Sequence, residues 1–324
     1  MNSFGRLFKV SLFGESHGEK IGIVIDGVRP GIPLSVSDFQ HDLERRKPGK
    51  TGTTTRTESD EAQIVSGIYQ GFTTGAPLTL LFENTNTRPA DYVQFVQQPR
   101  PGHADFVSGK KYMGYADPRG GGHFSGRMTV ALVAAGVVAK KMIQPVAIHS
   151  SILEIGGLTE YNDLLESLQL AGDSVGGLIE CKIQNVPVGW GEPFFDSVES
   201  IISHLVFSIP SIKGIEFGSG FKAAVMKGSE HNDLIVDESG KTKTNHSGGI
   251  NGGVSNGNEI VFRVAIKPTS SISTTQETFD FKTGKSEKLV ISGRHDSCVA
   301  LRVPVVLEAV TAIGLADLSL ISGW

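Results

Sequence analysis

Three separate stretches of this 324-residue chain place a histidine beside glycine, proline or arginine and close to a charged side chain. They are Gly14-Glu15-Ser16-His17-Gly18, Arg100-Pro101-Gly102-His103-Ala104-Asp105 and Arg294-His295-Asp296. Imidazole titrates near neutral pH, so a histidine held in a turn can give or take a proton at working pH. Arginines beside such histidines indicate a negatively charged substrate. The pattern therefore predicts proton transfer on an anion, with Asp105 close enough in sequence to orient the imidazole of His103.

Two further segments could bind the anion. The first, Asp42-Leu43-Glu44-Arg45-Arg46-Lys47-Pro48-Gly49, puts three cations at the end of an expected helix. Such cations would also complement the helix dipole without any ligand, and that alternative stays open. The second is a glycine-rich loop from Arg119 to Arg127, which opens an apolar helix. Backbone N–H groups there, with Ser125 and Arg127, would make an anion site, unless the loop is only a turn that caps a core helix.

Glycine is enriched in the same parts of the chain, at 40 of 324 residues, which indicates loops that approach a ligand closely. One glycine-rich segment, residues 245–253, leads into an expected strand. After that strand comes Lys267-Pro268-Thr269-Ser270-Ser271, whose lysine and hydroxyl groups could clamp a phosphate. Ordinary surface loops carry similar serine and threonine runs, so the segment by itself is weak evidence.

Composition limits the classes of protein. The net charge of −4 argues against general nucleic-acid binding, which favours a basic surface. The longest apolar run that we identify, residues 129–138, is too short to span a membrane, and no secretory pattern opens the sequence. The two cysteines, Cys181 and Cys298, have no metal-binding spacing. We therefore expect a cytoplasmic protein with reduced thiols and no bound metal.

Alternating apolar and polar residues predict strands that have one covered face. The predicted strands are residues 7–13, 21–26, 63–68, 77–82, 177–186, 218–227, 259–266 and 288–291. The predicted helices are residues 37–46, opened by a capping box from Ser37 to Gln40, and residues 127–143, 163–170, 196–207 and 304–319. No repeat or low-complexity linker divides the chain, so we expect a single domain over residues 1–324.

Taken together, these segments resemble the chorismate synthase family over nearly the whole chain. The matching motifs occur in the family's order: GESHG (14–18), DLERRKPG (42–49), RPGHAD (100–105), RGGG (119–122) with Ser125 and Arg127, GEP (191–193), NHSGGINGG (245–253), KPTSSIS (267–273) and GRHD (293–296). Each motif alone could arise by chance, but the ordered set could not.

The resemblance implies an α+β fold with central helices between two antiparallel sheets, and a homotetramer. It implies a lyase of the shikimate pathway, which leads to the aromatic amino acids. The reaction converts 5-enolpyruvylshikimate-3-phosphate to chorismate and phosphate by 1,4-anti elimination. It needs reduced FMN without net redox change. NADPH acting on the protein's own FMN and an external reductase both stay open as sources of the reduced flavin.

The resemblance also implies roles for individual residues. His103 would protonate the departing phosphate, His17 would stabilise the reduced flavin, and Ser16 with Asp296 would pass on the proton removed from C6. The implied substrate-binding residues are Arg46, Arg100, Ser125, Arg127 and Arg294. The implied FMN-binding residues are His123, Phe124, Ser125, Pro210, Ser211, Gly252, Lys267, Pro268, Thr269, Ser270, Ser271 and Arg294.

Three departures from the family pattern bear on the ligands. His123 and Phe124 replace a more usual Arg-Ser pair, which removes a cation and a hydroxyl next to the flavin. The loop after Gly49 is shorter and lacks an arginine, which weakens the case for nicotinamide binding there. Ser297 stands where proline is common.

Two other functions were weighed. A non-catalytic flavin- or phosphate-binding relative need not retain His17, His103 and Asp296 together. A flavin oxidoreductase that uses a hydride donor is disfavoured because no strand–GxGxxG–helix unit is present.

Overall fold

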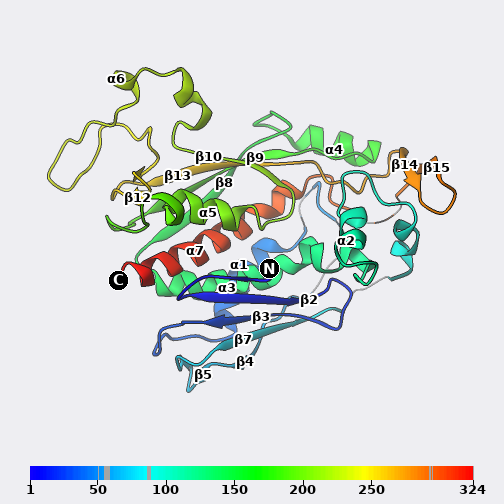
Figure 1. Ribbon diagram of the computed structural model, residues 1–324, viewed down its shortest axis with the longest axis horizontal. Helices are drawn as coiled ribbons and strands as arrows, with labels where there is room; N and C mark the ends of the chain where they lie inside the picture. The colour runs from blue at the N-terminus through cyan, green and yellow to red at the C-terminus, as the bar shows by residue number, and fades with distance from the viewer. Residues whose placement is uncertain (50, 55–58, 86–88, 292, 294, 324) are drawn as a thin grey trace.

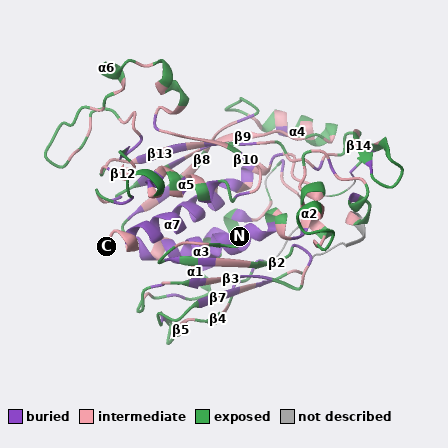
Figure 2. Ribbon diagram, viewed as in Figure 1, coloured by how far each residue is buried: buried purple, intermediate pink, exposed green. Residues whose placement is uncertain are grey.

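Two antiparallel sheets lie on opposite sides of a layer of helices (Figure 1). The computed structural model describes residues 1–324 except 50, 55–58, 86–88, 292, 294 and 324. Figure 2 shows that the helices between the sheets are the most buried elements of the fold. This is the α+β sandwich that the resemblance implies.

The first sheet has the strand order β1-β2-β3-β7-β4. Its strands are β1 (Ser3–Phe4), β2 (Lys9–Gly14), β3 (Lys20–Asp26), β7 (Leu78–Glu83) and β4 (Gln63–Ser66). On β3 and β7 the side chains of Ile21, Ile23, Ile25, Leu78 and Leu80 are fully buried. Alternate residues of these strands face the helical layer, as expected of a sheet with one covered face.

The second sheet has the order β10-β13-β9-β8. Its strands are β10 (Ile212–Phe217), β13 (Ile260–Ile266), β9 (Gly177–Gln184) and β8 (Ala147–Ile155). Three strand pairs lie outside the two large sheets: β5 (Ile68–Tyr69) with β6 (Phe72–Thr73), β11 (Ile250–Asn251) with β12 (Val254–Ser255), and β14 (Gln276–Asp280) with β15 (Lys285–Leu289).

Helix α3 (Thr129–Met142) contacts the first sheet, and α7 (Val303–Ile321) contacts the second. The two helices also pack against each other, closely enough that a Cβ at Gly136 would collide with Ala309. The other α-helices are α1 (Ser37–Arg46), α2 (Asp105–Lys111), α4 (Asn162–Ala171), α5 (Val198–Val206) and α6 (Gly228–His231). Short 3₁₀ helices are η1 (Pro89–Val96), η2 (Arg119–Phe124), η3 (Gly126–Met128), η4 (Phe194–Asp196), η5 (Gly220–Val225) and η6 (Val299–Arg302).

Helix α7 corrects the expectation about apolar runs. Residues Val299–Ile321 form a longer apolar segment than residues 129–138, with a mean hydropathy of 1.9. Its length and composition alone would allow it to cross a membrane, but 83% of its apolar stretch is buried inside the protein. These are properties of a core helix, and its place between the sheets accounts for them.

A buried ionic cluster joins the helices of the middle layer. Glu308 of α7 is 2% exposed and accepts hydrogen bonds from Arg45 of α1 at 2.7 Å and from Lys140 of α3 at 3.2 Å. Asp42 of α1 also pairs with Lys140, at 2.7 Å, and with Arg45, at 3.3 Å. The cations satisfy carboxylates that would be costly to bury alone.

Two details of the predicted elements were wrong. Residues 218–227 contain η5 (Gly220–Val225) instead of a strand, because Gly218 and Gly220, both at φ 54°, turn the chain after β10. The predicted capping box from Ser37 to Gln40 is not formed, because the Ser37 side chain does not cap α1. Two residues earlier, Asp38 Oδ2 accepts from the backbone N–H of Ser35 at 2.7 Å. The structure also contains strands β8, β10 and β14, which the sequence analysis did not identify.

Candidate functional site

A cavity of about 800 Å³ opens between the ends of the central helices and the loops of both sheets. Its lining residues come from nearly the whole chain, from Met1 to Val306. It includes most of the site residues expected from the sequence: Arg46, Arg100, His103, His123, Phe124, Ser125, Arg127, Pro210, Ser211, Lys267, Thr269, Ser270, Ser271 and Asp296. The volume lies in the upper part of the range of roughly 300–1,000 Å³ for small-molecule sites.

His103 is oriented by Asp105, as its sequence position indicated. Its Nδ1 lies 2.7 Å from Asp105 Oδ1, and the same carboxylate accepts from Arg100 Nε at 2.7 Å and from Nη2 at 2.8 Å. Burial would raise the pKa of Asp105, but Arg100 and His103 outweigh it and hold that pKa well below its usual range. Asp105 is therefore ionised and can accept a hydrogen bond from Nδ1–H of His103. The other ring nitrogen, Nε2, is then left to exchange a proton with a ligand.

Arg100 is fixed on several sides. Its Nη1 donates to Ser271 Oγ at 3.0 Å, and its guanidinium carbon lies 4.4 Å from the centroid of the Phe95 ring. The residue is 5% exposed. A guanidinium held in one geometry loses little freedom when it binds a carboxylate or phosphate.

Arg46 and Arg127 come from distant segments and meet at one carboxylate. Asp60 accepts from Arg46 Nη2 at 2.5 Å through Oδ2, and from Arg127 Nη1 through Oδ1. All three residues are less than 9% exposed. Burial lowers the pKa of Arg46 to about 10, although Asp60 opposes this effect, so the guanidinium stays protonated at neutral pH.

Lys267 and Ser270 tie the segment after β13 to the turn that carries His103. Lys267 Nζ donates to Ser270 Oγ at 2.6 Å and to the carbonyl of Gly102 at 3.0 Å. Burial, and then the nearby charge of Lys213, lower the pKa of Lys267. The two predicted ligand-binding segments therefore form one wall of the cavity.

Asp296 lies at the junction of α1, the loop after it, and α7. Its Oδ1 accepts from the backbone N–H of Thr54 at 2.8 Å, and its Oδ2 accepts from Arg302 Nη1 at 3.2 Å. Arg302 also donates from Nε to the carbonyl of Arg46 at 3.1 Å. Asp296 thus positions Arg302 in the cavity wall beside the end of α1.

Ser16 and His17 lie just behind the glycine-rich loop, where they are 1% and 6% exposed. His17 Nδ1 is 3.3 Å from Ser16 Oγ, so the two groups can share a proton. The edge of the Tyr92 ring packs against the imidazole, with ring centroids 5.1 Å apart. Gly120, which lines the cavity, covers this pair so closely that a Cβ there would collide with the His17 ring.

We therefore expect Gly120→Ala to displace His17. Gly120 has φ 60°, which an alanine adopts only with strain, and the added methyl group would occupy the space of the imidazole. With His17 in the role that the resemblance implies, turnover should fall by on the order of 10-fold or more, because a small misplacement of a catalytic group is costly. Gly114→Ala is the control, since Gly114 has φ 84° but open space at its Cβ position. Equal turnover of the two variants would contradict the assigned packing.

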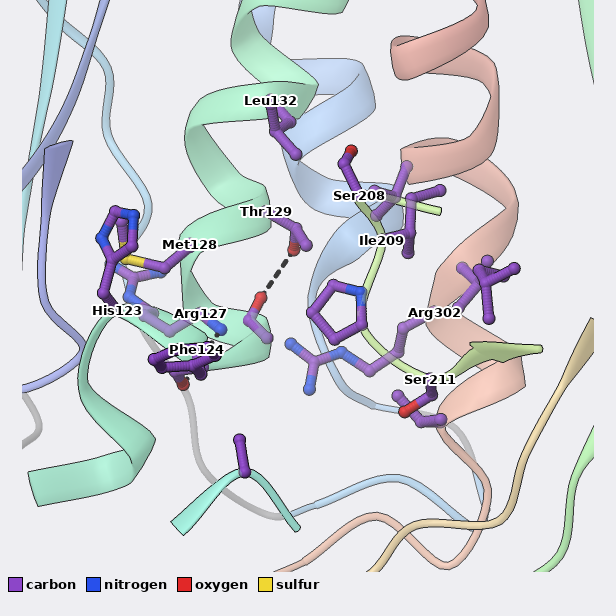
Figure 3. Close-up of a pocket in the computed structure, with 18 of the residues that line it drawn as sticks. His123, Phe124, Arg127, Met128, Thr129, Leu132, Ser208, Ile209, Ser211 and Arg302 are labelled. Atoms are coloured by element: carbon purple, nitrogen blue, oxygen red, sulfur yellow. Dashed lines mark hydrogen bonds between the residues drawn. The ribbon is translucent and has the colours of Figure 1, made fainter. Parts of the chain in front are cut away.

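The remaining predicted flavin residues face the cavity from opposite sides. Figure 3 shows Phe124 on the side of α3 and Ser211 on the side of α7. Arg302, which was not predicted, also lies on the side of α7. His123 Nδ1 donates to the carbonyl of Gly14 at 2.8 Å, which fixes its ring. Ser125 Oγ accepts from the backbone N–H of Arg127 at 3.3 Å. The Ser125 side chain therefore caps the start of η3, and Ser125 also lines the cavity.

Four of the described residues that were predicted for the site do not line the cavity: Ser16 and His17, which lie behind Gly120, and Gly252 and Pro268. Gly252 lies in the hairpin between β11 and β12, where its Cβ position faces open space, and Pro268 lies between wall residues without lining the cavity itself. Arg294 lies outside the described residues. Among the residues that are described, no cluster of His, Cys, Asp or Glu could hold a metal ion.

The sequence analysis missed Asp60, Tyr92 and Arg302. All three line the cavity. Asp60 and Arg302 lie in segments with no recognisable motif, and their partners are distant in sequence, so the pairs could not be inferred. Tyr92 precedes the RPGHAD motif by eight residues, and an aromatic residue so placed is unremarkable without the fold.

Known proteins resemble this chain over nearly its whole length. The family model described as "Chorismate synthase" matches residues 8–320. A chorismate synthase of Chitinophaga pinensis is 59% identical over 322 residues, which cover 99% of this chain and 97% of that protein. One from Dehalococcoides mccartyi is 43% identical, with 99% and 97% covered. A solved chorismate synthase structure superposes with a TM-score of 0.75 at 26% identity, and covers 98% of this chain and 93% of its own. The chain therefore belongs to the chorismate synthase family.

Proposed function

We propose that this cavity converts 5-enolpyruvylshikimate-3-phosphate to chorismate and phosphate by 1,4-anti elimination. The reaction breaks the C3–O bond to phosphate and removes a proton from C6. The observation that carries the proposal is that one cavity brings together His103, oriented by an ionised Asp105, and the buried guanidinium groups of Arg46, Arg100 and Arg127.

Charge compensation explains the number of cations. The substrate carries two carboxylates and a phosphate, and a guanidinium can bind either group through two N–H donors. Arg46, Arg100 and Arg127 are mostly withdrawn from water, where a charge-assisted hydrogen bond is stronger than at the surface. Ser125 and Lys267 add donors to the same cavity. Arg294 completes the proposed substrate set on the strength of the GRHD motif alone.

His103 is proposed as the acid that protonates the departing phosphate. Its Nδ1 proton is committed to Asp105, so the proton delivered into the cavity comes from Nε2. Protonation of the leaving oxygen then lowers the charge that develops on the phosphate.

The residues present also fit FMN. The apolar side chains of Leu132, Ile209 and Val306 line the cavity and could receive a flavin ring. Thr269 Oγ1 is buried and has no hydrogen-bond partner within the described protein, which is the state expected of a hydroxyl that a ligand satisfies. When bound, reduced FMN would supply the recycled electron that lets phosphate leave without net oxidation of the substrate.

The proposed flavin-binding set keeps its predicted members. It comprises His123, Phe124, Ser125, Pro210, Ser211, Gly252, Lys267, Pro268, Thr269, Ser270, Ser271 and Arg294. His17 is proposed to hold a proton beside the reduced ring. Ser16, which can share a proton with His17, and Asp296 are proposed to pass on the proton that leaves C6.

A non-catalytic phosphate- or flavin-binding protein is the second candidate. It would need the donors of the cavity but not an imidazole oriented by a carboxylate. His17, His103 and Asp296 are all present, and each has a polar side-chain partner: Ser16, Asp105 and Arg302, respectively. This arrangement favours the lyase.

Anaerobic turnover separates the two functions. The protein, supplied with dithionite-reduced FMN and the enolpyruvyl phosphate substrate, should release phosphate and chorismate over many cycles for each flavin. A yield of one chorismate per flavin would contradict a recycled electron, and no chorismate at all would favour the binding protein. Repeating the assay with NADPH as the sole reductant tests whether the protein reduces its own FMN.

Three further assignments rest mainly on the family. We propose a homotetramer, supported by exposed apolar side chains in η5, where Phe221 and Val225 are each 83% exposed. We propose a cytoplasmic location, supported by two buried free thiols; burial raises the pKa of Cys181 to about 12 and that of Cys298 to about 11. We propose a single domain, supported by one apolar core that reaches both sheets.

A further inference from the structure

Asp60 lies where two of the proposed substrate-binding arginines meet. Its carboxylate is fully buried and uses one oxygen for each guanidinium: Oδ2 for Arg46, at 2.5 Å, and Oδ1 for Arg127. The three residues lie on separate segments, so nothing in the local chain requires the contact. Asp60 lines the cavity together with both arginines.

The carboxylate is ionised in this position. Burial by itself would raise the pKa of Asp60, but the positive charges of Arg46 and Arg127 outweigh burial and lower it. Without Asp60, two guanidinium groups would face each other with little access to water. Coulomb repulsion between like charges at short range is strong in such surroundings, so Asp60 stabilises the pair before any ligand binds.

The two arginines differ in what they can still offer a ligand. Arg127 donates to Asn84 Oδ1 at 3.0 Å from Nε and to the carbonyl of Glu83 at 3.2 Å from Nη2, in addition to Asp60. Arg46 Nε is buried and has no hydrogen-bond partner within the described residues. The Arg127 guanidinium is thus held in place by three protein acceptors. The Arg46 Nε–H group remains available to donate a hydrogen bond to an anion.

We propose that Asp60 is a positioning residue that sets both the geometry and the net charge of the Arg46 and Arg127 pair. The inference rests on the proposed function, in which these arginines bind an anionic substrate whose phosphate must afterwards leave. With Asp60 ionised, the three side chains carry one net positive charge instead of two. The released phosphate is therefore held firmly enough to be oriented and weakly enough to depart.

Asp60→Asn isolates the charge. Asparagine has almost the same shape, and it tolerates the left-handed backbone of Asp60, at φ 51°, as well as aspartate does. The variant should bind inorganic phosphate on the order of 10-fold more tightly, because an opposing charge close to the anion has been removed. Substrate KM should fall or stay the same while kcat falls, and phosphate should become a stronger product inhibitor.

Asp42→Asn is the matched control. Asp42 is also a buried carboxylate, on the same helix as Arg46, and it lies between Arg45 and Lys140 outside the cavity. Its loss should lower the melting temperature but leave the affinity for phosphate unchanged. A merely structural role for Asp60 would make the two variants behave alike.

Calorimetric titration with inorganic phosphate at fixed ionic strength measures the affinity, and the rise in melting temperature with phosphate gives a second reading. If Asp60→Asn is unstable alone, phosphate should restore its melting temperature more than it raises that of the wild-type protein. Phosphate affinity equal to or weaker than wild type in Asp60→Asn, or no restoration, would overturn the role of Asp60. Failure of the wild-type protein to form chorismate anaerobically would instead count against the proposed function, independently of this comparison.

Discussion

His103→Ala should bind substrate and FMN nearly as well as the wild-type protein but turn over on the order of 10²- to 10⁴-fold more slowly. The side chain is held by Asp105 at 2.7 Å, and it is proposed to give its Nε2 proton only when phosphate departs, so its loss should affect the chemical step. Single-turnover phosphate release under anaerobic conditions measures that step. A substrate analogue whose leaving group needs less protonation should lose less activity.

Two comparisons make the result specific. His149→Ala, on the exposed part of β8, should retain activity. His17→Ala should change the absorption spectrum of bound reduced flavin from a protonated toward an anionic form, and His103→Ala should leave the spectrum unchanged. The opposite pattern of spectra would mean that the roles of the two histidines are exchanged or wrong.

Arg127→Ala should lower kcat/KM by about 2–4 kcal/mol of transition-state stabilisation, which is roughly 30- to 1,000-fold. The guanidinium is 8% exposed, so a substrate charge left without it has little water to compensate. Arg127→Lys should recover part of the loss, since an ammonium keeps the charge but cannot reproduce all the contacts of the guanidinium to Asp60, Asn84 and Glu83. Steady-state kinetics with the enolpyruvyl phosphate substrate measures the effect.

The control for Arg127 is Arg263→Ala. Arg263 lies on β13 and pairs with Glu216 at 2.6 Å, away from the lining of the cavity. Its removal should leave kcat/KM close to the wild-type value. Full activity of Arg127→Ala, with the same loss of stability as Arg263→Ala, would show that Arg127 only supports the start of the central helix.

The helices were the more predictable part of the fold. Residues 37–46 and 163–170 match α1 and α4 within one residue at each end, because an apolar period and a clear stop are local signals. Strand β8 was missed because its exposed and half-buried positions do not alternate strictly. The error at residues 218–227 arose because an apolar run beside glycines can be a strand or a turn, and only the pairing of β10 with β13 decides.

Contacts in the site were predictable where both interacting residues belong to the same short motif. His103 and Asp105 are two residues apart, so their contact could be expected from sequence. The contact of Asp60 with Arg127 spans 67 residues, and that of Asp296 with the backbone of Thr54 spans 242. Such pairs depend on how the sheets and helices stack, which a single sequence does not encode in any local pattern.

The residues that line the cavity come from distant parts of the chain, and this should affect how fast the protein is degraded in a cell. Residues near Met1 and residues near Val306 line the same space, so the cavity exists only when the whole chain has folded. Partly folded chains cannot bind the ligands, and long-range closure of this kind is slow to form. A ligand at 100 times its Kd would then stabilise the complete fold by about 2.7 kcal/mol. Abundant ligand should therefore protect the protein from proteolysis, and starvation for it should shorten the protein's lifetime.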